Sequence, residues 1–411
     1  MSFKDLHLIK PLQRAVEASG YAEPTLVQQR SIPLVLDRKD VIVSAQTGTG
    51  KTAAFALPIL QQLYDKQDAP KKGKKIRALI ISPTRELAIQ IQQNFQTYAQ
   101  FTNLTSLVVF GGASIEPQID VLKKGVDILV ATPGRLLDLH KQDYINLDYI
   151  ETFVLDEADL MLAMGFIDDV KKIERLCPKG KQTLLFSATI PYKIEELAQT
   201  ILKDPERIDV TPTKSVAKDV SQILYYVPKR DKIELCLHLL RHTIKGNVLI
   251  FRRTKYGVDK LEETLLKNGF AVNSLHGDKG QSERQNALNK FKNGYVKVLI
   301  ATDVAARGID INELDNVFNF DMPNVPETYV HRIGRTGRAG HTGKAYALCS
   351  ADEKSYVKTI QNYINVQIPV ETEHPYLLDP KAKPIVHKKQ GSKYKKGRKS
   401  EASKKKKKRW Y

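Results

Sequence analysis

Short apolar segments recur along the chain in two separate sets, and they constrain the fold more than any other feature. Each segment is three or four residues long, and a stretch with helical character separates it from the next. The first set comprises residues 41–43, 78–81, 107–110, 128–130, 153–155 and 183–186, and the second comprises 248–251, 298–300, 317–320 and 345–348. Continuous apolar strands that alternate with helices are typical of a parallel sheet covered on both faces. We therefore predict an α/β fold with two parallel-sheet domains in tandem.

The stretch between the two sets has the composition of a linker. It contains Asp204-Pro205 and then Thr211-Pro212-Thr213-Lys214, and prolines in such positions interrupt regular structure. A chain of 411 residues also exceeds the size at which one hydrophobic core usually suffices. The predicted organisation is a first domain over residues 1–207, a linker over 208–217, a second domain over 218–368 and a tail over 369–411.

Positive charge is concentrated at the C-terminal end. Residues 381–411 contain 15 Lys or Arg and one acid, Glu401, so they carry +14 of the net +19 and leave +5 for the other 380 residues. Dense cationic segments bind phosphate backbones by releasing condensed counterions. Tyr394, Trp410 and Tyr411 add rings that can stack on bases. We interpret this segment as a disordered basic tail that binds nucleic acid; the alternative is a solvated tail that aids solubility.

The sequence carries no signal for a membrane or an oxidising compartment. No apolar run approaches the roughly 20 residues that a membrane helix needs, and the first residues lack the layout of a signal peptide. Cys177, Cys236 and Cys349 are isolated and odd in number, which argues against a disulfide framework and against a zinc site. We predict a cytoplasmic protein whose cysteines are buried in the core.

A phosphate-binding loop is predicted directly after the apolar segment 41–43. The loop residues are Ala45, Gln46, Thr47, Gly48, Thr49, Gly50, Lys51 and Thr52, and a helical segment follows. The glycines let backbone N–H groups turn toward phosphate oxygens, and the helix N-terminus adds partial positive charge. In this pattern Lys51 reaches the β- and γ-phosphates and the Thr52 hydroxyl coordinates Mg²⁺. Ala45 stands where the strict pattern has glycine, and an ordinary tight turn is the alternative.

Two carboxylates follow the apolar segment 153–155. In open parallel sheets, ligands gather beyond the carboxyl ends of the strands, so Asp156 and Glu157 are expected near the phosphate loop. Asp156 would hold Mg²⁺, largely through water, and Glu157 would orient and deprotonate the attacking water. Adjacent acids at a strand end can also cap a helix. Their pairing with the loop at 45–52 favours the catalytic interpretation.

The order of further motifs resembles the DEAD-box family of RNA helicases, within helicase superfamily 2, over about residues 3–350. The matching segments are Phe3 with residues 20–28, then 83–88, 111–112, 132–135, 156–159 and 187–189, and in the second half Gln281 with Arg284, 301–310 and 331–338, with 251–254 as a looser match. The resemblance implies two tandem RecA-like (P-loop NTPase) domains. The opening block and the basic tail look most like the bacterial RhlE-type branch.

The resemblance also implies roles around the nucleotide. Gln28 can donate to and accept from the adenine edge, and Tyr21 could stack on the base. Gly308 and Asp310 match the segment that binds the nucleotide, with Asp310 at the ribose. Arg335 and Arg338 match the arginine fingers that stabilise charge on the γ-phosphate; surface arginines in a glycine-rich loop are the alternative. The residues implied to couple ATP to RNA are Asp159, Ser187, Thr189 and His331.

RNA contacts are implied on both domains. The candidates are Thr84, Arg85, Gly112, Thr132, Arg135, Arg284 and Thr302. Hydroxyls and glycine-rich turns offer donors to phosphates and do not distinguish base edges, so we expect little sequence preference. Contacts to the 2′-OH would favour RNA over DNA. For any one threonine or glycine, turn formation is the alternative.

The predicted activity is that of an ATP-dependent RNA helicase, with ATP and Mg²⁺ as cofactors and single-stranded or short duplex RNA as partner. We expect a monomer, and ribosome assembly or RNA decay as its setting. Two alternatives stay open. One is an RNA clamp or annealing chaperone with a vestigial ATPase, against which the intact Lys51, Glu157 and Arg338 argue. The other is a DNA translocase of the same superfamily, which the segment 20–28 and the Asp-Glu-Ala-Asp motif disfavour.

Overall fold

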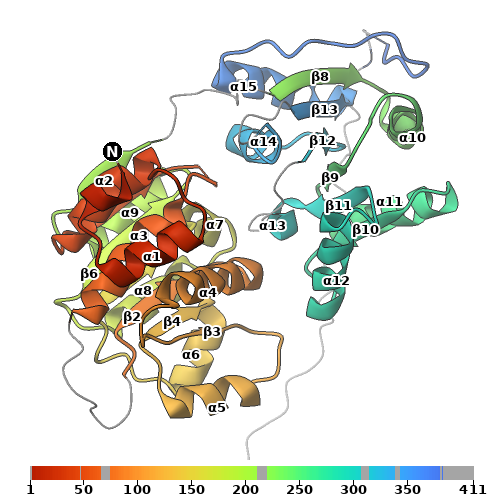
Figure 1. The fold of residues 1–411 in the computed structure, drawn as a ribbon. Coiled ribbons are helices and arrows are strands. Elements are labelled where there is room, and N and C mark those ends of the chain that lie inside the picture. Colours follow the sequence, from red (N-terminus) through yellow and green to blue (C-terminus); the bar gives the residue numbers. More distant parts are fainter. Residues whose placement is uncertain are drawn as a thin grey trace, which may run out of the picture.

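Two parallel sheets, each covered by helices on both faces, form the body of the protein (Figure 1). The computed structural model describes residues 2–46, 48–65, 75–210, 220–306, 314–337, 343–379 and 382. The basic segment 383–411 lies outside the described residues. In the part that is described, no helix is long and apolar enough to cross a membrane.

The first sheet has seven strands in the order β3-β4-β2-β5-β6-β1-β7, all paired in parallel. Its strands are β1 (Val41–Ser44), β2 (Ala78–Ile81), β3 (Ser106–Val109), β4 (Ile128–Ala131), β5 (Thr152–Leu155), β6 (Gln182–Ser187) and β7 (Glu206–Asp209). The helices of this half are η1 (Phe3–Leu6), α1 (Lys10–Ala18), α2 (Leu26–Leu36), α3 (Lys51–Tyr64), α4 (Arg85–Ala99), α5 (Glu116–Lys124), α6 (Pro133–Lys141), α7 (Ala158–Ala163), α8 (Ile167–Arg175) and α9 (Tyr192–Ile201).

The second sheet has six strands in the order β10-β11-β9-β12-β13-β8, again all parallel. Its strands are β8 (Val220–Tyr226), β9 (Val248–Arg252), β10 (Val272–Leu275), β11 (Val298–Thr302), β12 (Asn316–Asn319) and β13 (Gly343–Cys349). The helices are η2 (Lys229–Asp231), α10 (Lys232–His242), α11 (Lys255–Lys267), α12 (Gln281–Lys292), α13 (Asp303–Ala306), α14 (Pro326–Ile333), η3 (Ala351–Glu353) and α15 (Lys354–Ile364).

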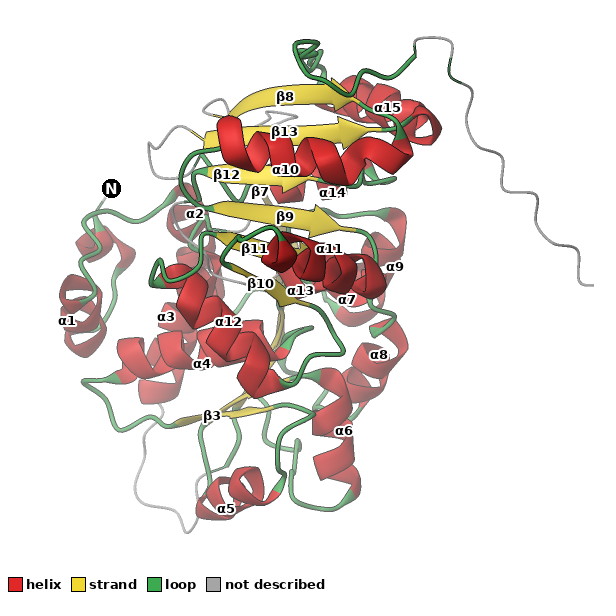
Figure 2. Cartoon of the chain, turned by 90° about the vertical axis from the view of Figure 1, so that its right-hand side faces the viewer, coloured by secondary structure: helices red, strands yellow, loops and turns green. Residues whose placement is uncertain are grey.

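Strand geometry explains why the apolar segments are continuous. Successive side chains of a strand point to opposite faces, so a sheet covered on both faces needs apolar residues at every position. In β1, Val41 and Val43 belong to the core under α1–α4, whereas Ile42 belongs to the core under α5–α9. In the second sheet, α10 and α11 cover one face, and α14 and α15 lie behind the other (Figure 2). The apolar residues of α12 and α13 pack on the same face as α14 and α15. The predicted α/β class with two tandem parallel-sheet domains is confirmed.

Three features differ from the sequence-based expectation. Strands β7, β8 and β10 were not among the predicted apolar segments, because each mixes polar with apolar residues. Residues 208 and 209, assigned to the linker, belong to β7, which pairs with β1. Segment 369–379, assigned to the tail, lies along the edge of β8: the Leu224 N–H donates to the Pro369 carbonyl at 2.8 Å, and the Glu371 N–H donates to the Leu224 carbonyl at 2.9 Å. The packed part of the second half therefore extends beyond residue 368.

The cysteines lie where the sequence suggested. Cys177, Cys236 and Cys349 are all buried and unbridged. Burial in apolar surroundings raises the pKa of each thiol to about 12. The prediction that they are core residues is confirmed.

Candidate active site and nucleic-acid interface

Strand order divides the carboxyl edge of the first sheet into two regions. The phosphate loop follows β1, and residues 156–159 follow β5. Residues 187–189 begin at the last residue of β6, which lies between those two strands. The neighbouring strands β3, β4 and β2 end at the segments that contain Gly112, Thr132 and Thr84. One half of the edge therefore collects the predicted nucleotide residues, and the other half collects the predicted RNA residues.

The phosphate loop turns sharply into α3. Gly48 and Gly50 both have φ of 86°, in the left-handed region that residues with a Cβ rarely adopt. Helix α3 begins at Lys51, so its free N–H groups point into the loop, where they can bind phosphate oxygens. Thr47 lies outside the described residues. Ala45, which departs from the strict pattern, is fully buried directly after β1. Its N–H donates to the Ser187 carbonyl at 3.0 Å and so extends the hydrogen bonding between β1 and β6.

Lys51 forms a buried ion pair with Glu157. Its Nζ lies 2.6 Å from Glu157 Oε1, and both side chains are nearly inaccessible to solvent. Burial disfavours the charge on Lys51, but the carboxylates of Glu157 and Asp156 outweigh it and raise the pKa of the ammonium. Glu157 also has left-handed backbone angles, φ 55° and ψ 52°. Such strain in a residue other than glycine costs of order 1–3 kcal/mol and is concentrated at functional sites.

Asp156 is the residue best suited to a cation. It is 4% exposed, and its Oδ1 is a buried carboxylate oxygen without a hydrogen-bond partner. Burial raises its pKa to about 7, and Lys51 opposes this shift. Asp156 and the Thr52 hydroxyl line the same cleft. An unpartnered oxygen beside a hydroxyl and a phosphate loop fits Mg²⁺, which binds few protein ligands and keeps several waters.

We predict that Asp156→Asn stabilises the nucleotide-free protein at about pH 8. A carboxyl whose pKa is higher in the folded state than in the unfolded state stabilises the protein when the pH is below the unfolded-state pKa of 3.8. That stabilisation is lost as the pH rises through the folded-state pKa of about 7. Asparagine avoids the buried charge, so the melting temperature of the Asp156→Asn variant should exceed that of the wild type by about 2–6 °C at about pH 8. The difference should shrink at about pH 5, where Asp156 is protonated. Thermal unfolding followed by circular dichroism at both pH values tests this, and equal melting temperatures at about pH 8 would contradict it.

Gln28 connects the segment 20–28 to the phosphate loop. Its amide oxygen accepts the Thr25 N–H at 2.9 Å, and its amide nitrogen donates to the Gly50 carbonyl at 3.2 Å. The Thr25 hydroxyl donates to the Thr49 carbonyl at 2.8 Å. The amide expected at the adenine edge is thus 4% exposed and bonded within the protein. A base at this site would be positioned by a segment already attached to the loop that holds its phosphates.

Tyr21 is an aromatic residue in the wall of the nucleotide cleft. Its ring stacks on Phe3 with centroids 6.4 Å apart, and its hydroxyl is 3.0 Å from that of Tyr98 on α4. The cleft measures about 610 Å³, and Tyr21, Lys51 and Glu157 all line it. Gln90, Asn94 and Tyr98 of α4 also line it, and none of these was singled out from the sequence. Their spacing of four residues, one helical face, was the available signal.

The second domain contributes to the same cleft. Arg335, which follows α14 and is 5% exposed, lies in its wall together with Lys51 and Glu157. The site is therefore divided between two domains. Arg338, Gly308 and Asp310 lie outside the described residues.

A hydrogen-bonded cluster joins the segments after β5 and β6. The Thr189 hydroxyl donates to Asp159 Oδ2 at 2.9 Å, and the Asp159 N–H donates to Ser187 Oγ at 3.1 Å. The Ser187 hydroxyl in turn donates to the Thr189 carbonyl at 2.7 Å. His331 lies on α14 of the second domain. A shift of residues 156–159 during catalysis would therefore move residues 187–189 as well.

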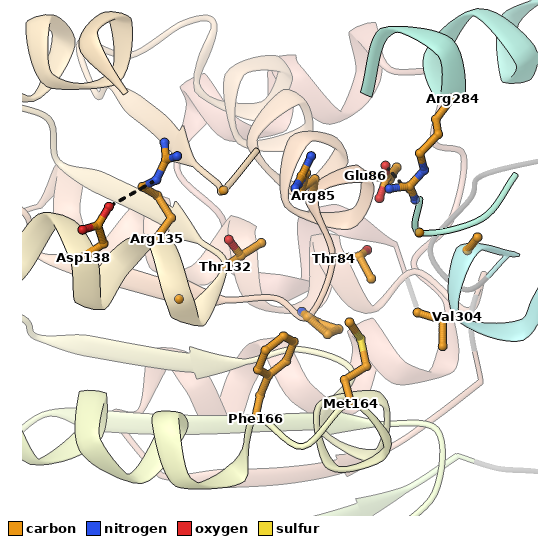
Figure 3. A pocket seen from close by; sticks show the side chains of 15 residues that line it. Thr84, Arg85, Glu86, Thr132, Arg135, Asp138, Met164, Phe166, Arg284 and Val304 are labelled. Carbon is orange, nitrogen blue, oxygen red and sulfur yellow. Dashed lines mark ion pairs between the residues drawn. The ribbon is translucent and has the colours of Figure 1, made fainter. Parts of the chain in front are cut away.

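A second cleft of about 500 Å³ lies between the domains on the other half of the edge (Figure 3). Five of the predicted RNA residues line it: Thr84, Arg85, Thr132, Arg135 and Arg284. Gly112 and Thr302, by contrast, are not among the described residues that line it. Gly111 is, and Thr302 ends β11 just before the lining residue Val304.

Two arginines hold the 111–113 turn. The Arg85 guanidinium packs so closely on Gly112 that any side chain at position 112 would overlap it. Arg135 donates to the Ala113 carbonyl at 3.0 Å. Burial lowers the pKa of Arg85, and the nearby positive charges of Arg284 and Arg135 add to this effect. Two carboxylates line the same cleft: Asp138 lies 3.8 Å from Arg135, and Glu86 opposes the shift at Arg85. The three arginines therefore leave a small excess of positive charge, which favours an anionic ligand.

Arg284 crosses the cleft from α12 to the first domain. Its Nη2 lies 3.0 Å from Glu86 Oε1 on α4, with both side chains mostly buried. The sequence predicted Arg284 as an RNA contact and did not single out Glu86. The structure adds an ion pair between domains at the same position.

The geometry defines a class of protein: an NTPase whose site is divided between two parallel-sheet domains. The family model for DEAD/DEAH box helicases matches residues 25–197, and that for the helicase conserved C-terminal domain matches residues 231–340. The DEAD-box ATP-dependent RNA helicase CshA of Bacillus subtilis is 44% identical over 361 residues, which cover 88% of this chain and 72% of the relative. The ATP-dependent RNA helicase CshA of Limosilactobacillus reuteri is 43% identical over 370 residues, covering 90% and 73%.

Solved structures agree with this assignment. Dbp5 of S. cerevisiae bound to RNA and ADP BeF3 has a TM-score of 0.80 and 32% identity, covering 90% of this chain and 95% of that one. Mss116p bound to ssRNA and AMP-PNP has a TM-score of 0.80 and 28% identity, covering 91% and 79%. The chain belongs to the DEAD-box family of ATP-dependent RNA helicases.

Proposed function

We propose that this protein hydrolyses ATP when RNA binds between its domains and uses the cycle to separate short RNA duplexes. The observation that carries the proposal is the divided nucleotide cleft, in which Lys51 and Glu157 of the first domain line the same space as Arg335 of the second. A site assembled from two domains is complete only when they are closed. The second cleft, which we call the RNA cleft, also lies between the two domains. RNA and ATP would therefore favour the same closed arrangement of the domains.

The chain's residues have distinct tasks in this cycle. ATP binding would draw Lys51 away from Glu157 to the phosphates, which frees the Glu157 carboxylate to accept a proton from the attacking water. Thr52 and Asp156 would hold Mg²⁺, which supplies charge neutralisation on the phosphates. Arg335 would stabilise the charge on the transferring group, and Arg338 would assist it. The Asp159–Thr189 contact would transmit the change toward the RNA side.

Strand separation would follow from the shape of the RNA cleft. Arg85, Arg135 and Arg284 would hold a strand by its backbone. A strand held in a bend that a duplex cannot tolerate releases its partner. Phosphate release would then reopen the domains.

Steady-state ATPase rates with single-stranded RNA, matched DNA and no nucleic acid test the proposal. RNA should stimulate hydrolysis well above the other two conditions. Equal stimulation by DNA would favour a DNA translocase, and a rate near zero in all three would favour an RNA clamp or annealing chaperone.

The proposal extends to the subfamily, the cofactor, the oligomeric state and the cellular setting. The opening block and the basic tail support an RhlE-type branch, whereas the relatives named above are CshA proteins. We further propose Mg²⁺ as cofactor, a monomeric state, a cytoplasmic location and a role in ribosome assembly or RNA decay.

We also propose that the +14 segment adds RNA affinity. A chain ending at residue 380 should bind RNA more weakly, and the slope of log affinity against log salt should become shallower, because fewer counterions are released. Fluorescence anisotropy with a labelled RNA across a salt series measures both. An unchanged slope would leave the tail as an aid to solubility.

A further inference from the structure

One wall of the RNA cleft is apolar, and none of the arginines proposed to bind phosphates belongs to it. Met164 and Phe166 lie opposite Thr84 and Thr132, and Val304 faces the same space from the second domain (Figure 3). Val304 is 48% exposed, whereas the next two residues of its short helix are buried. Met164 and Phe166 are half-buried, so the three side chains leave apolar surface beside the charged residues of the cleft.

The backbone holds this wall in a defined position. Helix α7 ends at Ala163 with Met164 as its C-cap, and Gly165 with φ 79° reverses the chain. The Gly165 N–H donates to the Leu162 carbonyl at 3.1 Å, and the Phe166 N–H donates to the Met161 carbonyl at 2.9 Å. This pattern of two bonds around a left-handed glycine closes a helix end and fixes the residue that follows it. Phe166 also packs against the core of the first domain, so its orientation does not depend on a ligand.

We propose that Met164, Phe166 and Val304 form an apolar contact surface for the nucleosides of the bound RNA strand. This inference rests on the proposed function. Arg85, Arg135 and Arg284 line the same cleft as the apolar wall, so a strand bound through its phosphates would place ribose or base faces within reach of that wall. Every nucleoside has such apolar faces, so the contact is tolerant of sequence. Because Val304 belongs to the other domain, the surface is complete only while the domains are closed.

Phosphate contacts and apolar contacts respond differently to salt, and this difference makes the inference testable. Each lost phosphate contact makes the slope of log affinity against log salt shallower, by about 0.7 for a single strand. Burial of apolar surface releases no counterions. Loss of the apolar wall should therefore lower RNA affinity by the same factor at every salt concentration.

The test uses full-length protein, a non-hydrolysable ATP analogue and a labelled uridine RNA of about ten nucleotides. Val304→Thr has nearly the same shape but places a hydroxyl against the RNA, and we expect it to weaken RNA binding about 5-fold. The double variant Val304→Thr/Met164→Gln should weaken RNA binding at least about 10-fold. In both variants the slope of log affinity against log salt should equal that of the wild type. Val121→Thr, an exposed valine of α5 outside both clefts, is the matched control and should bind as the wild type does. Arg135→Gln should instead flatten the slope.

An abasic oligonucleotide of the same length identifies the nucleoside part that is contacted. A loss of affinity with both oligonucleotides assigns the contact to ribose, and a loss with the base-carrying strand alone assigns it to the bases. The inference is overturned if both wall variants bind with wild-type affinity, or if they flatten the slope as Arg135→Gln does. Failure of the proposed function would be seen separately, as wild-type protein whose RNA affinity does not respond to the ATP analogue.

Discussion

Replacing Glu157 with glutamine is expected to lower ATP turnover about 100- to 10,000-fold, the usual contribution of a general base. Glutamine keeps the size of the side chain but cannot accept the proton of the attacking water. In the proposed cycle, domain closure depends on Lys51, Arg335 and the bound phosphates, so RNA binding should still depend on ATP. Affinity for a non-hydrolysable ATP analogue should rise several-fold, because the nucleotide no longer has to break the buried ion pair with Lys51.

Single-turnover hydrolysis and analogue titration measure these two effects separately. Glu263→Gln on α11 is a suitable control, because it removes a carboxylate that forms a surface pair with Lys267 and lines neither cleft. The control should retain wild-type turnover. A Glu157→Gln protein that hydrolyses ATP at the normal rate would refute the assignment of Glu157 as the base.

Reversing the charge at Glu86 should reduce RNA-stimulated ATPase activity at least about 30-fold, because breaking a buried charge pair at an interface costs about 2–5 kcal/mol. In Glu86→Arg, two guanidinium groups would face each other where the closed domains now meet at 3.0 Å. Neither side chain stabilises its own domain through this pair, so thermal stability should change little. The effect should appear as loss of RNA stimulation with the basal rate unaffected.

The double variant Glu86→Arg/Arg284→Glu separates an ion pair from an RNA contact. If the pair itself supports closure, the swap should restore part of the RNA stimulation that either single variant loses. If Arg284 acts only by binding a phosphate, the double variant should be as inactive as Arg284→Glu alone. Comparison of ATPase rates for the wild type, both single variants and the double variant forms a double-mutant cycle that measures this coupling.

Much of the fold could be predicted because parallel sheets leave a simple pattern in a sequence. A strand such as β2 is buried on both faces, so every residue is apolar and the segment is recognisable by itself. Edge strands lack this property: β7 has three exposed residues of four, and it was assigned in part to the linker. Segment 369–379 was likewise assigned to the tail, because pairing with β8 uses backbone groups that any residue supplies.

The sequence by itself determined the chemistry of the nucleotide site, because a phosphate loop and a strand-end carboxylate pair need particular residues at fixed local spacing. Lys51, Asp156 and Glu157 could be named for that reason. Only the tertiary structure decided which groups meet: the buried Lys51–Glu157 pair, the attachment of Gln28 to the phosphate loop, the Glu86–Arg284 bridge, and the wall of Met164, Phe166 and Val304. These contacts join segments that the strand order brings together from distant parts of the chain. Their energies depend on distance and burial, which local sequence does not encode.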